Sequence, residues 1–221
     1  MTDLTGRTLL IAGATSRSGR VVTQTLRDAG AAVIAVGHDP AKLEALSALG
    51  ARAESCDLTD ERAVATLADR LHADGVRIDG LLHLVGGWRG GGGLAGQSEA
   101  DFRYLERSLT ALRFVTRAFD ADLQGSDAAR LAIVSSIQVD RPLAGGANYA
   151  TIKAASETWT RAVAHGFAKA ARDAERPLAA ASVIFRVKAL EGLEQNLADR
   201  FVGLWDADAA EINGTVIDLT A

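Results

Sequence analysis

The chain has 221 residues, of which 48% are hydrophobic and 24% charged, and its formal net charge is −4. This composition is ordinary for a globular protein, and the length suits one large α/β domain spanning residues 1–221. The small negative charge argues against a nucleic-acid partner, and the lack of any apolar run of spanning length argues against a membrane one. Cys56 is the only cysteine, which excludes an internal disulfide and predicts a reducing, cytoplasmic location.

Short apolar segments alternate with longer helical patterns along the chain. The expected strands are Thr8–Ala12, Ala32–Val36, a weaker one at Ala51–Cys56, Gly80–Val85, Leu131–Ser135, Ala180–Phe185 and Thr215–Leu219. The expected helices are Gly19–Ala29, Ala41–Leu49, Asp60–Ala73, Glu99–Leu123, Tyr149–Asp173 and Leu190–Leu204. Most strands are continuously apolar, which is typical of strands buried on both faces. The pattern therefore predicts a single doubly wound Rossmann-type α/β domain, with a central parallel sheet of about seven strands and helices on both faces.

A glycine-containing turn follows the first expected strand and leads into a helix. Gly13 allows a tight turn there, and Gly19 lets the helix pack close to its strand. The start of the helix then offers free N–H groups and positive potential to a pyrophosphate. The candidate nucleotide-binding residues between the two glycines are Thr15, Ser16, Arg17 and Ser18.

Tyr149 and Lys153 lie four residues apart in an expected helix, so their side chains point the same way. A lysine ammonium beside a phenol lowers the tyrosine pKa, which suits a general acid or base. Ser136 lies thirteen residues before Tyr149, at the end of an expected strand, and its hydroxyl can hold a carbonyl oxygen. Taken alone, the Tyr149/Lys153 spacing also fits a half-buried tyrosine beside a solvated lysine.

With these motifs in register, the chain resembles the short-chain dehydrogenase/reductase family over nearly its whole length. The resemblance implies that Ser136 orients a carbonyl, Tyr149 donates its proton, and Lys153 lowers the Tyr149 pKa and binds the nicotinamide ribose. It implies an oxidoreductase that interconverts a carbonyl and an alcohol on a small molecule. Two alternatives remain: a nucleotide-binding member without turnover, serving as sensor or structural subunit, and non-redox dehydration or isomerisation on the same scaffold.

The cofactor residues follow the family pattern with departures. Arg17 replaces the middle glycine of the family's T-G-x-x-x-G-x-G and either reaches a phosphate or stays solvated. Asp57, followed by Leu58, matches the aspartate that holds the adenine amino group, and it also fits a turn or helix N-cap. Gly86 keeps the glycine of the family's N-N-A-G, whereas His83 takes its first position and is interpreted as a core residue.

The end of the second strand decides the expected nucleotide. Family members that prefer NAD typically place a carboxylate there, which accepts from the ribose 2′-OH. This chain has Gly37 and His38, with Asp39 one position later. A 2′-phosphate would therefore not be repelled, and His38 or Arg17 could attract it, so NADP(H) is favoured over NAD(H).

Three further features concern the surroundings of the catalytic residues. Ser108 aligns with the family's helix asparagine, which helps to hold a proton-relay water, and Arg186-Val187 replaces its P-G pair. The short stretch between Val187 and the last strand predicts a shortened substrate lid. The glycine-rich loop, Gly86–Gly93, is expected to be mobile, as a surface connection or as a substrate-side flap.

The helices expected at Glu99–Leu123 and Tyr149–Asp173 carry apolar residues beyond one core stripe, including Phe114 and Trp159. In the family the corresponding helices pair between subunits, so a homodimer or homotetramer is expected. Alternatively, these aromatic residues complete the core of the monomer. No metal site is predicted.

Overall fold

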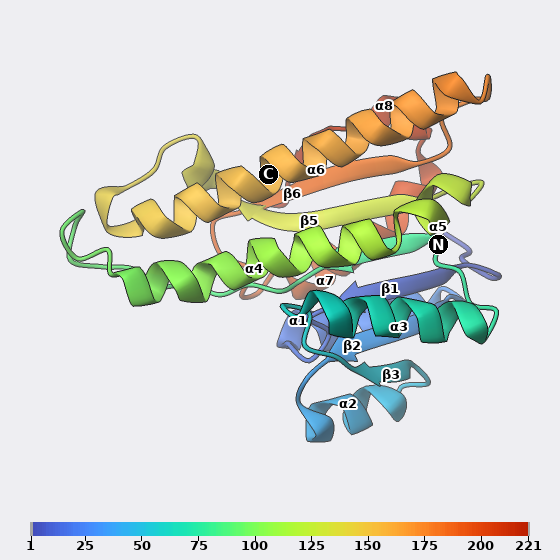
Figure 1. The fold of residues 1–221 in the computed structure, drawn as a ribbon, viewed down its shortest axis with the longest axis horizontal. Coiled ribbons are helices and arrows are strands. Elements are labelled where there is room, and N and C mark those ends of the chain that lie inside the picture. The colour runs from blue at the N-terminus through green and yellow to red at the C-terminus, as the bar shows by residue number, and fades with distance from the viewer. Residues whose placement is uncertain (1, 221) are drawn as a thin grey trace.

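Seven parallel strands form one sheet at the centre of the molecule, in the order β3-β2-β1-β4-β5-β6-β7 (Figure 1). The computed structural model describes residues 2–220. The strands are β1 (Thr8–Ala12), β2 (Ala32–Gly37), β3 (Arg52–Ser55), β4 (Gly80–His83), β5 (Arg130–Ser136), β6 (Ala181–Val187) and β7 (Val216–Asp218). Strand order reverses between β1 and β4, and ligands of such sheets bind at the carboxyl ends of the strands around this point. The prediction of a doubly wound parallel sheet is confirmed.

Helices cover both faces of the sheet (Figure 1). One face carries α3 (Glu61–Ala73), α4 (Glu99–Ala118) and α6 (Ala147–Asp173), and the other carries α1 (Arg17–Asp28) and α7 (Glu194–Val202). The shorter helices are α2 (Pro40–Ser47), α5 (Asp120–Gly125) and α8 (Ala209–Ile212). Alternate residues of one strand enter the two cores, as Leu9 and Leu10 of β1 do, which is why the strand is apolar throughout. No helix within residues 2–220 is both long enough and apolar enough to cross a membrane.

Two of the expected helices differ from the observed ones. The helix expected to run to Leu123 breaks at Phe119, where φ is −110° and ψ is 12°, and α5 continues from there. The ring of Phe119 is buried edge-on against His72, with the ring centroids 6.0 Å apart. The free energy gained by burying this ring therefore exceeds the free energy lost by interrupting the helix. The helix expected from Leu190 begins only at Glu194 and ends in a 3₁₀ turn at Gly203–Asp206.

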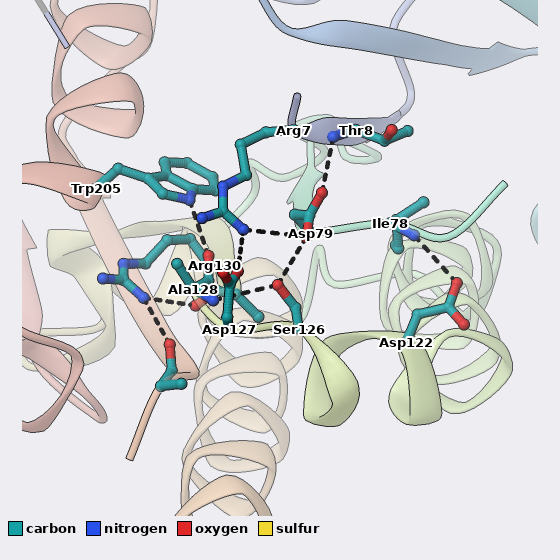
Figure 2. Close-up of polar contacts among 12 residues, drawn as sticks. Arg7, Thr8, Ile78, Asp79, Asp122, Ser126, Asp127, Ala128, Arg130 and Trp205 are labelled. Carbon is teal, nitrogen blue, oxygen red and sulfur yellow. Dashed lines mark hydrogen bonds and ion pairs between the residues drawn. The ribbon is translucent and has the colours of Figure 1, made fainter. Parts of the chain in front are cut away.

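A polar cluster joins the amino ends of the central strands, at the end of the sheet away from the ligand crevice (Figure 2). Asp79, just before β4, accepts from the backbone N–H of Thr8 at 2.9 Å and from the Ser126 hydroxyl at 2.7 Å. Arg7 pairs with both Asp79 and Asp127. The cluster therefore ties β1, β4 and the turn before β5 together.

Arg130, at the start of β5, attaches the C-terminal part of the chain to the sheet. Its side chain is nearly buried, with 4% of the residue exposed. Its guanidinium donates to the carbonyl oxygens of Leu204, Ala207 and Ala179 at 2.8–2.9 Å. Trp205 packs beside it and donates to the Ala128 carbonyl at 2.8 Å (Figure 2). Planar, multiple donation of this kind suits arginine rather than lysine.

Replacing Arg130 with methionine should lower the free energy of unfolding by about 2–4 kcal/mol, because buried carbonyl oxygens lose their donors. Urea unfolding followed by circular dichroism measures the change. Arg62→Met, on the exposed side of α3, is the control and should change stability by less than about 0.5 kcal/mol. Equal unfolding midpoints for the two variants would contradict the role given to Arg130.

Candidate active site

A cleft of about 420 Å³ lies at the carboxyl ends of β1, β2 and β4, at the switch in strand order. It is lined by the turn after β1, the end of β2 and the segments after β3 and β4. The sequence-predicted residues among its lining are Gly13, Thr15, Ser16, His38, Asp57, Leu58, Gly86 and Ser108. Among residues 2–220, no group of acidic, histidine and cysteine side chains is arranged to hold a metal ion.

The glycine turn has the shape of a phosphate cradle. Gly13 has φ +85°, and a Cβ there would lie 2.8 Å from the backbone nitrogen of Val85. A Cβ on Gly19 would lie 2.2 Å from the Ala14 carbonyl oxygen, so only glycine lets α1 start this close to β1. Ser16 caps α1 by accepting from the Gly19 N–H at 3.0 Å, and Ser18 is buried in the first helical turn. The open backbone and the positive end of α1 together fit the pyrophosphate of a dinucleotide.

Arg17, in place of the family's middle glycine, is held by an acidic partner. Its side chain is 75% exposed, and its Nε lies 3.2 Å from Oε1 of Glu194, at the start of α7. A phosphate would therefore compete with the Glu194 carboxylate for this guanidinium. The exposed side chain agrees with a solvated arginine, and contact of Arg17 with a phosphate stays a prediction.

Lys42 is a candidate cofactor residue that the sequence reasoning missed. It lies in the first turn of α2 and lines the same cleft as His38. Its ammonium is 3.4 Å from Asp39, whose carboxylate caps α2 by accepting from the Lys42 N–H at 3.2 Å. The capping pattern Asp39-Pro40 predicts that α2 begins here. A basic residue in the first turn of that helix was the signal that could have indicated Lys42 as a cofactor residue.

The three catalytic candidates come from two elements that meet at the carboxyl edge of the sheet. Ser136 is the last residue of β5, and Tyr149 and Lys153 lie on the first two turns of α6. Ser136 is fully buried, and its hydroxyl oxygen accepts from the Gln138 N–H at 3.2 Å. Lys153 Nζ is 5.7 Å from the centroid of the Tyr149 ring.

Burial affects the pKa of both Tyr149 and Lys153. Burial raises the pKa of Tyr149, and a hydrogen bond with Ser136 acts in the opposite direction. The lowering of that pKa by Lys153 stays a prediction; in this structure the ammonium donates to the Val134 carbonyl at 2.7 Å. Burial lowers the pKa of Lys153 to about 8, and the negative charge of Glu157 opposes this change. In this structure the phenol is therefore the protonated, donor form at neutral pH.

Ser108, the residue aligned with the family asparagine, uses its hydroxyl within its own helix. The hydroxyl donates to the Leu105 carbonyl of its own helix at 2.8 Å. The Ser108 carbonyl oxygen lies 3.1 Å from Nε2 of His83. His83 is buried, as interpreted, but its Nδ1 has no hydrogen-bond partner among residues 2–220.

The glycine-rich loop, which is expected to be mobile, is held by several hydrogen bonds. The Gln97 side-chain amide donates to the carbonyl oxygens of Gly91, Gly93 and Gly145 and accepts from the Asn148 N–H, all at 3.0–3.2 Å. The Gly91 N–H also donates to the Gly145 carbonyl at 2.7 Å. The loop after β4 is therefore fixed against the segment that precedes α6, which carries Tyr149.

Arg186, in place of the family's P-G pair, ends β6 with a buried ion pair. Its Nε and Nη2 donate to the two oxygens of Glu157 at 2.8 Å each, and Glu157 is fully buried. Glu157 also accepts from the Ser135 hydroxyl at 2.7 Å. Arg186 pairs in addition with Asp140, in the segment after Ser136. This network therefore joins β5, β6 and α6 directly behind the catalytic candidates.

Glu157→Gln should lower the free energy of unfolding at pH 7 by about 3 kcal/mol, because Arg186 loses its buried counter-charge. Although burial raises the pKa of Glu157, hydrogen bonds from Arg186, Ser135 and Arg161 leave it below the usual glutamate value. The stabilisation is therefore complete above about pH 4.3 and is lost as the pH falls through the lower folded-state pKa. Urea unfolding between pH 7 and pH 3 measures both effects.

The matched control for this prediction is Glu191→Gln, which removes an exposed carboxylate from the loop after β6. It should leave both the stability at pH 7 and its decline in acid unchanged. If Glu157→Gln behaves in the same way as Glu191→Gln, the buried ion pair does not stabilise the fold.

Residues 13–172 match the family model described as enoyl-(acyl carrier protein) reductase. This match covers more than half of the chain and includes the glycine turn, the serine strand and the Tyr149/Lys153 helix. The chain belongs to the short-chain dehydrogenase/reductase family. It is accordingly an NAD(P)-dependent oxidoreductase.

Solved structures of the family share the fold over almost the whole chain. A short-chain dehydrogenase from Shigella flexneri 2a, complexed with NADP, has 20% identity and a TM-score of 0.86, with 100% of both chains covered. A short-chain dehydrogenase from Escherichia coli CFT073 has 21% identity and a TM-score of 0.87, covering 99% of this chain and 97% of the other. An NADPH-bound short-chain oxidoreductase from Pseudomonas aeruginosa, described as having an atypical catalytic center, has 19% identity and a TM-score of 0.83, covering 99% and 96%. No curated protein matches the sequence.

Proposed function

We propose that this oxidoreductase interconverts a carbonyl and an alcohol on a small molecule, with NADP(H) as hydride carrier and Tyr149 as general acid/base. One observation carries the proposal. Ser136, Tyr149 and Lys153 converge at the carboxyl ends of the strands, where the glycine cradle and the neighbouring cleft fit a dinucleotide. Family membership supports the reaction class, and the residues support the roles.

In the direction of reduction, the bound nicotinamide supplies the hydride. Ser136, fixed at the end of β5, holds the carbonyl oxygen, and Tyr149 gives its phenolic proton to that oxygen. The raised pKa of Tyr149 keeps this proton in place at neutral pH. Lys153, one helical turn further on, then stabilises the phenolate by its positive charge. Oxidation of the alcohol runs through the same groups in reverse, with the phenolate accepting the proton.

Tyr149→Phe should lower kcat by roughly 10²–10⁴-fold, because the proton donor is lost. Nucleotide affinity should stay nearly unchanged, since the cradle at Gly13 is untouched. NADPH oxidation with a panel of ketones and aldehydes measures turnover, and quenching of NADPH fluorescence measures binding. Unchanged turnover in this variant would remove Tyr149 from the mechanism.

The same assays separate the alternatives. NADPH binding without turnover on any carbonyl would favour a sensor or structural subunit. Product formation without consumption of NADPH would indicate dehydration or isomerisation on this scaffold.

The preference for NADP(H) is supported by the charges at the end of β2. Neither Gly37 nor His38 carries a carboxylate that could accept from a ribose 2′-OH, and Asp39 is engaged as the N-cap of α2. Lys42 and His38 line the cleft on this side. A 2′-phosphate would thus meet a cationic rather than an anionic edge.

Lys42→Met should raise the Kd for NADPH about tenfold, equivalent to the loss of one charge-assisted contact, while the Kd for NADH stays within about twofold. Fluorescence titration with both nucleotides measures the ratio. Lys169→Met, which removes an exposed ammonium from the far part of α6, is the control. An equal loss of affinity for both nucleotides would show that Lys42 does not read the 2′-phosphate.

A homodimer or homotetramer, a small-molecule substrate and a cytoplasmic location complete the proposal. Within one chain, Phe114 and Trp159 pack against the core under α4 and α6, and the Trp159 indole donates to the Thr116 hydroxyl at 2.9 Å. These aromatic residues therefore serve the monomer core at least in part, and subunit pairing would use their remaining exposed edges. Sedimentation velocity distinguishes the assemblies.

A further inference from the structure

His83, at the end of β4, and Lys153, on α6 beside the end of β5, each carry a hydrogen-bonding group that has no partner among residues 2–220. His83 is the last residue of β4 and lies opposite Ile133 of β5. Lys153 Nζ donates to the carbonyl of Val134, the next residue of β5. A Cβ on Gly86, just after β4, would lie 3.7 Å from Nζ. The ammonium therefore lies beside the end of β5 and the residue three positions after His83.

The tautomer of His83 follows from its one contact. Nε2 lies 3.1 Å from the Ser108 carbonyl oxygen, and a carbonyl can only accept, so Nε2 carries the proton. Nδ1 then bears a lone pair, is buried, and has no partner among residues 2–220. The ring is 6% exposed, and burial together with the charge of Lys153 lowers its pKa to about 3. At neutral pH His83 is thus a neutral hydrogen-bond acceptor.

Lys153 has donors to spare. An ammonium carries three N–H donors, and within the described part of the chain one of them reaches the Val134 carbonyl. Its titratable neighbours are Tyr149 and Glu157 on α6 and His83 on β4. From the adjoining elements, α4 contributes Tyr104 and Arg107 to the cleft, and Arg186 of β6 is paired with Glu157.

We propose that His83 is a positioning residue for Lys153: Nδ1 accepts a hydrogen bond from one water that the ammonium also binds, while Nε2–H is anchored on the Ser108 carbonyl. The Ser108 hydroxyl, turned to Leu105, plays no part in this link. The pairing keeps Lys153 charged at the edge of the site and fixes its distance from Tyr149. Its consequence for turnover rests on the proposed function, whereas the pairing itself does not.

NMR of the free protein tests the pairing without any turnover. Long-range ¹H–¹⁵N spectra of histidine-labelled protein should show His83 as the Nε2–H tautomer, with no titration between pH 5 and pH 9. The ¹³Cε signal of Lys153, assigned with Lys153→Arg, reports the lysine pKa. In His83→Leu this pKa should fall by about one unit, because the acceptor for the charged form is lost.

Two further variants keep the result interpretable. His83→Gln retains an amide donor for Ser108 and a carbonyl acceptor for Lys153, so it should restore the lysine pKa to within about 0.3 of the wild-type value. Ser108→Ala should leave the lysine pKa unchanged, because only the backbone of Ser108 is used. A proton on Nδ1, an unchanged lysine pKa in a folded His83→Leu, or a fall in Ser108→Ala as large as in His83→Leu would each overturn the proposal.

Kinetics then show whether the pairing matters for turnover. The pH profile of kcat should move to lower pH in His83→Leu and return in His83→Gln, while KM for NADPH changes less than twofold. Absence of turnover in the wild type would reject the proposed function but leave the NMR result standing.

Discussion

A buried carboxylate holds together the three elements that carry the candidate active site. Glu157 accepts from Ser135 on β5, from Arg186 on β6 and from Arg161 on its own helix, so all of its charge is compensated by donors. Ser135 precedes the catalytic candidate Ser136, and Glu157 lies one helical turn after Lys153. A buried ion is tolerated only with such complete compensation, which restricts β5, β6 and α6 to one relative placement. The distance between the serine and the tyrosine therefore depends on a group that takes no part in the chemistry.

The positions that depart from the family pattern have hydrogen-bond partners of their own in this structure. Without the P-G pair, the end of β6 is anchored by Arg186 through Glu157 and Asp140. Ser108 of α4 stands at the position of the helix asparagine, and its backbone carbonyl contacts His83. His83 occupies the first position of the altered N-N-A-G segment. A buried polar group that loses its partner must find another. This explains how several substitutions can coexist with an intact Ser136/Tyr149/Lys153 set.

Those parts of the fold that depend on local pattern were predictable from the sequence. Every expected strand is present, because strands buried on both faces read as apolar runs. The spacing of Ser136, Tyr149 and Lys153 predicted a candidate catalytic site at the end of β5 and the start of α6. Contacts between distant positions were not predictable. Arg17 pairs with Glu194, which lies far away in the sequence and belongs to no common motif. The Lys153 ammonium donates to the Val134 carbonyl, a contact that the spacing of Lys153 and Tyr149 does not predict. The break at Phe119 likewise depends on packing against His72, which hydrophobic periodicity does not encode.

The path of the glycine-rich loop could not be predicted from its composition alone. Eight residues with six glycines have a large conformational entropy when free, and ordering them is costly. Gly91, Gly92 and Gly93 all have positive φ, between +66° and +117°, so the loop needs glycine for its path rather than for mobility. One glutamine, Gln97, offsets the ordering cost by bridging carbonyls of this loop and of the segment before α6. The segment after β6 meanwhile packs Leu197 and Phe201 into the core against α1. The glycine-rich loop and the segment before α6 are therefore fixed to each other, and they expose the side chains of Trp88 and Leu143, respectively. If the substrate binds beside them, its selection would depend on this preformed rim rather than on closure of a lid.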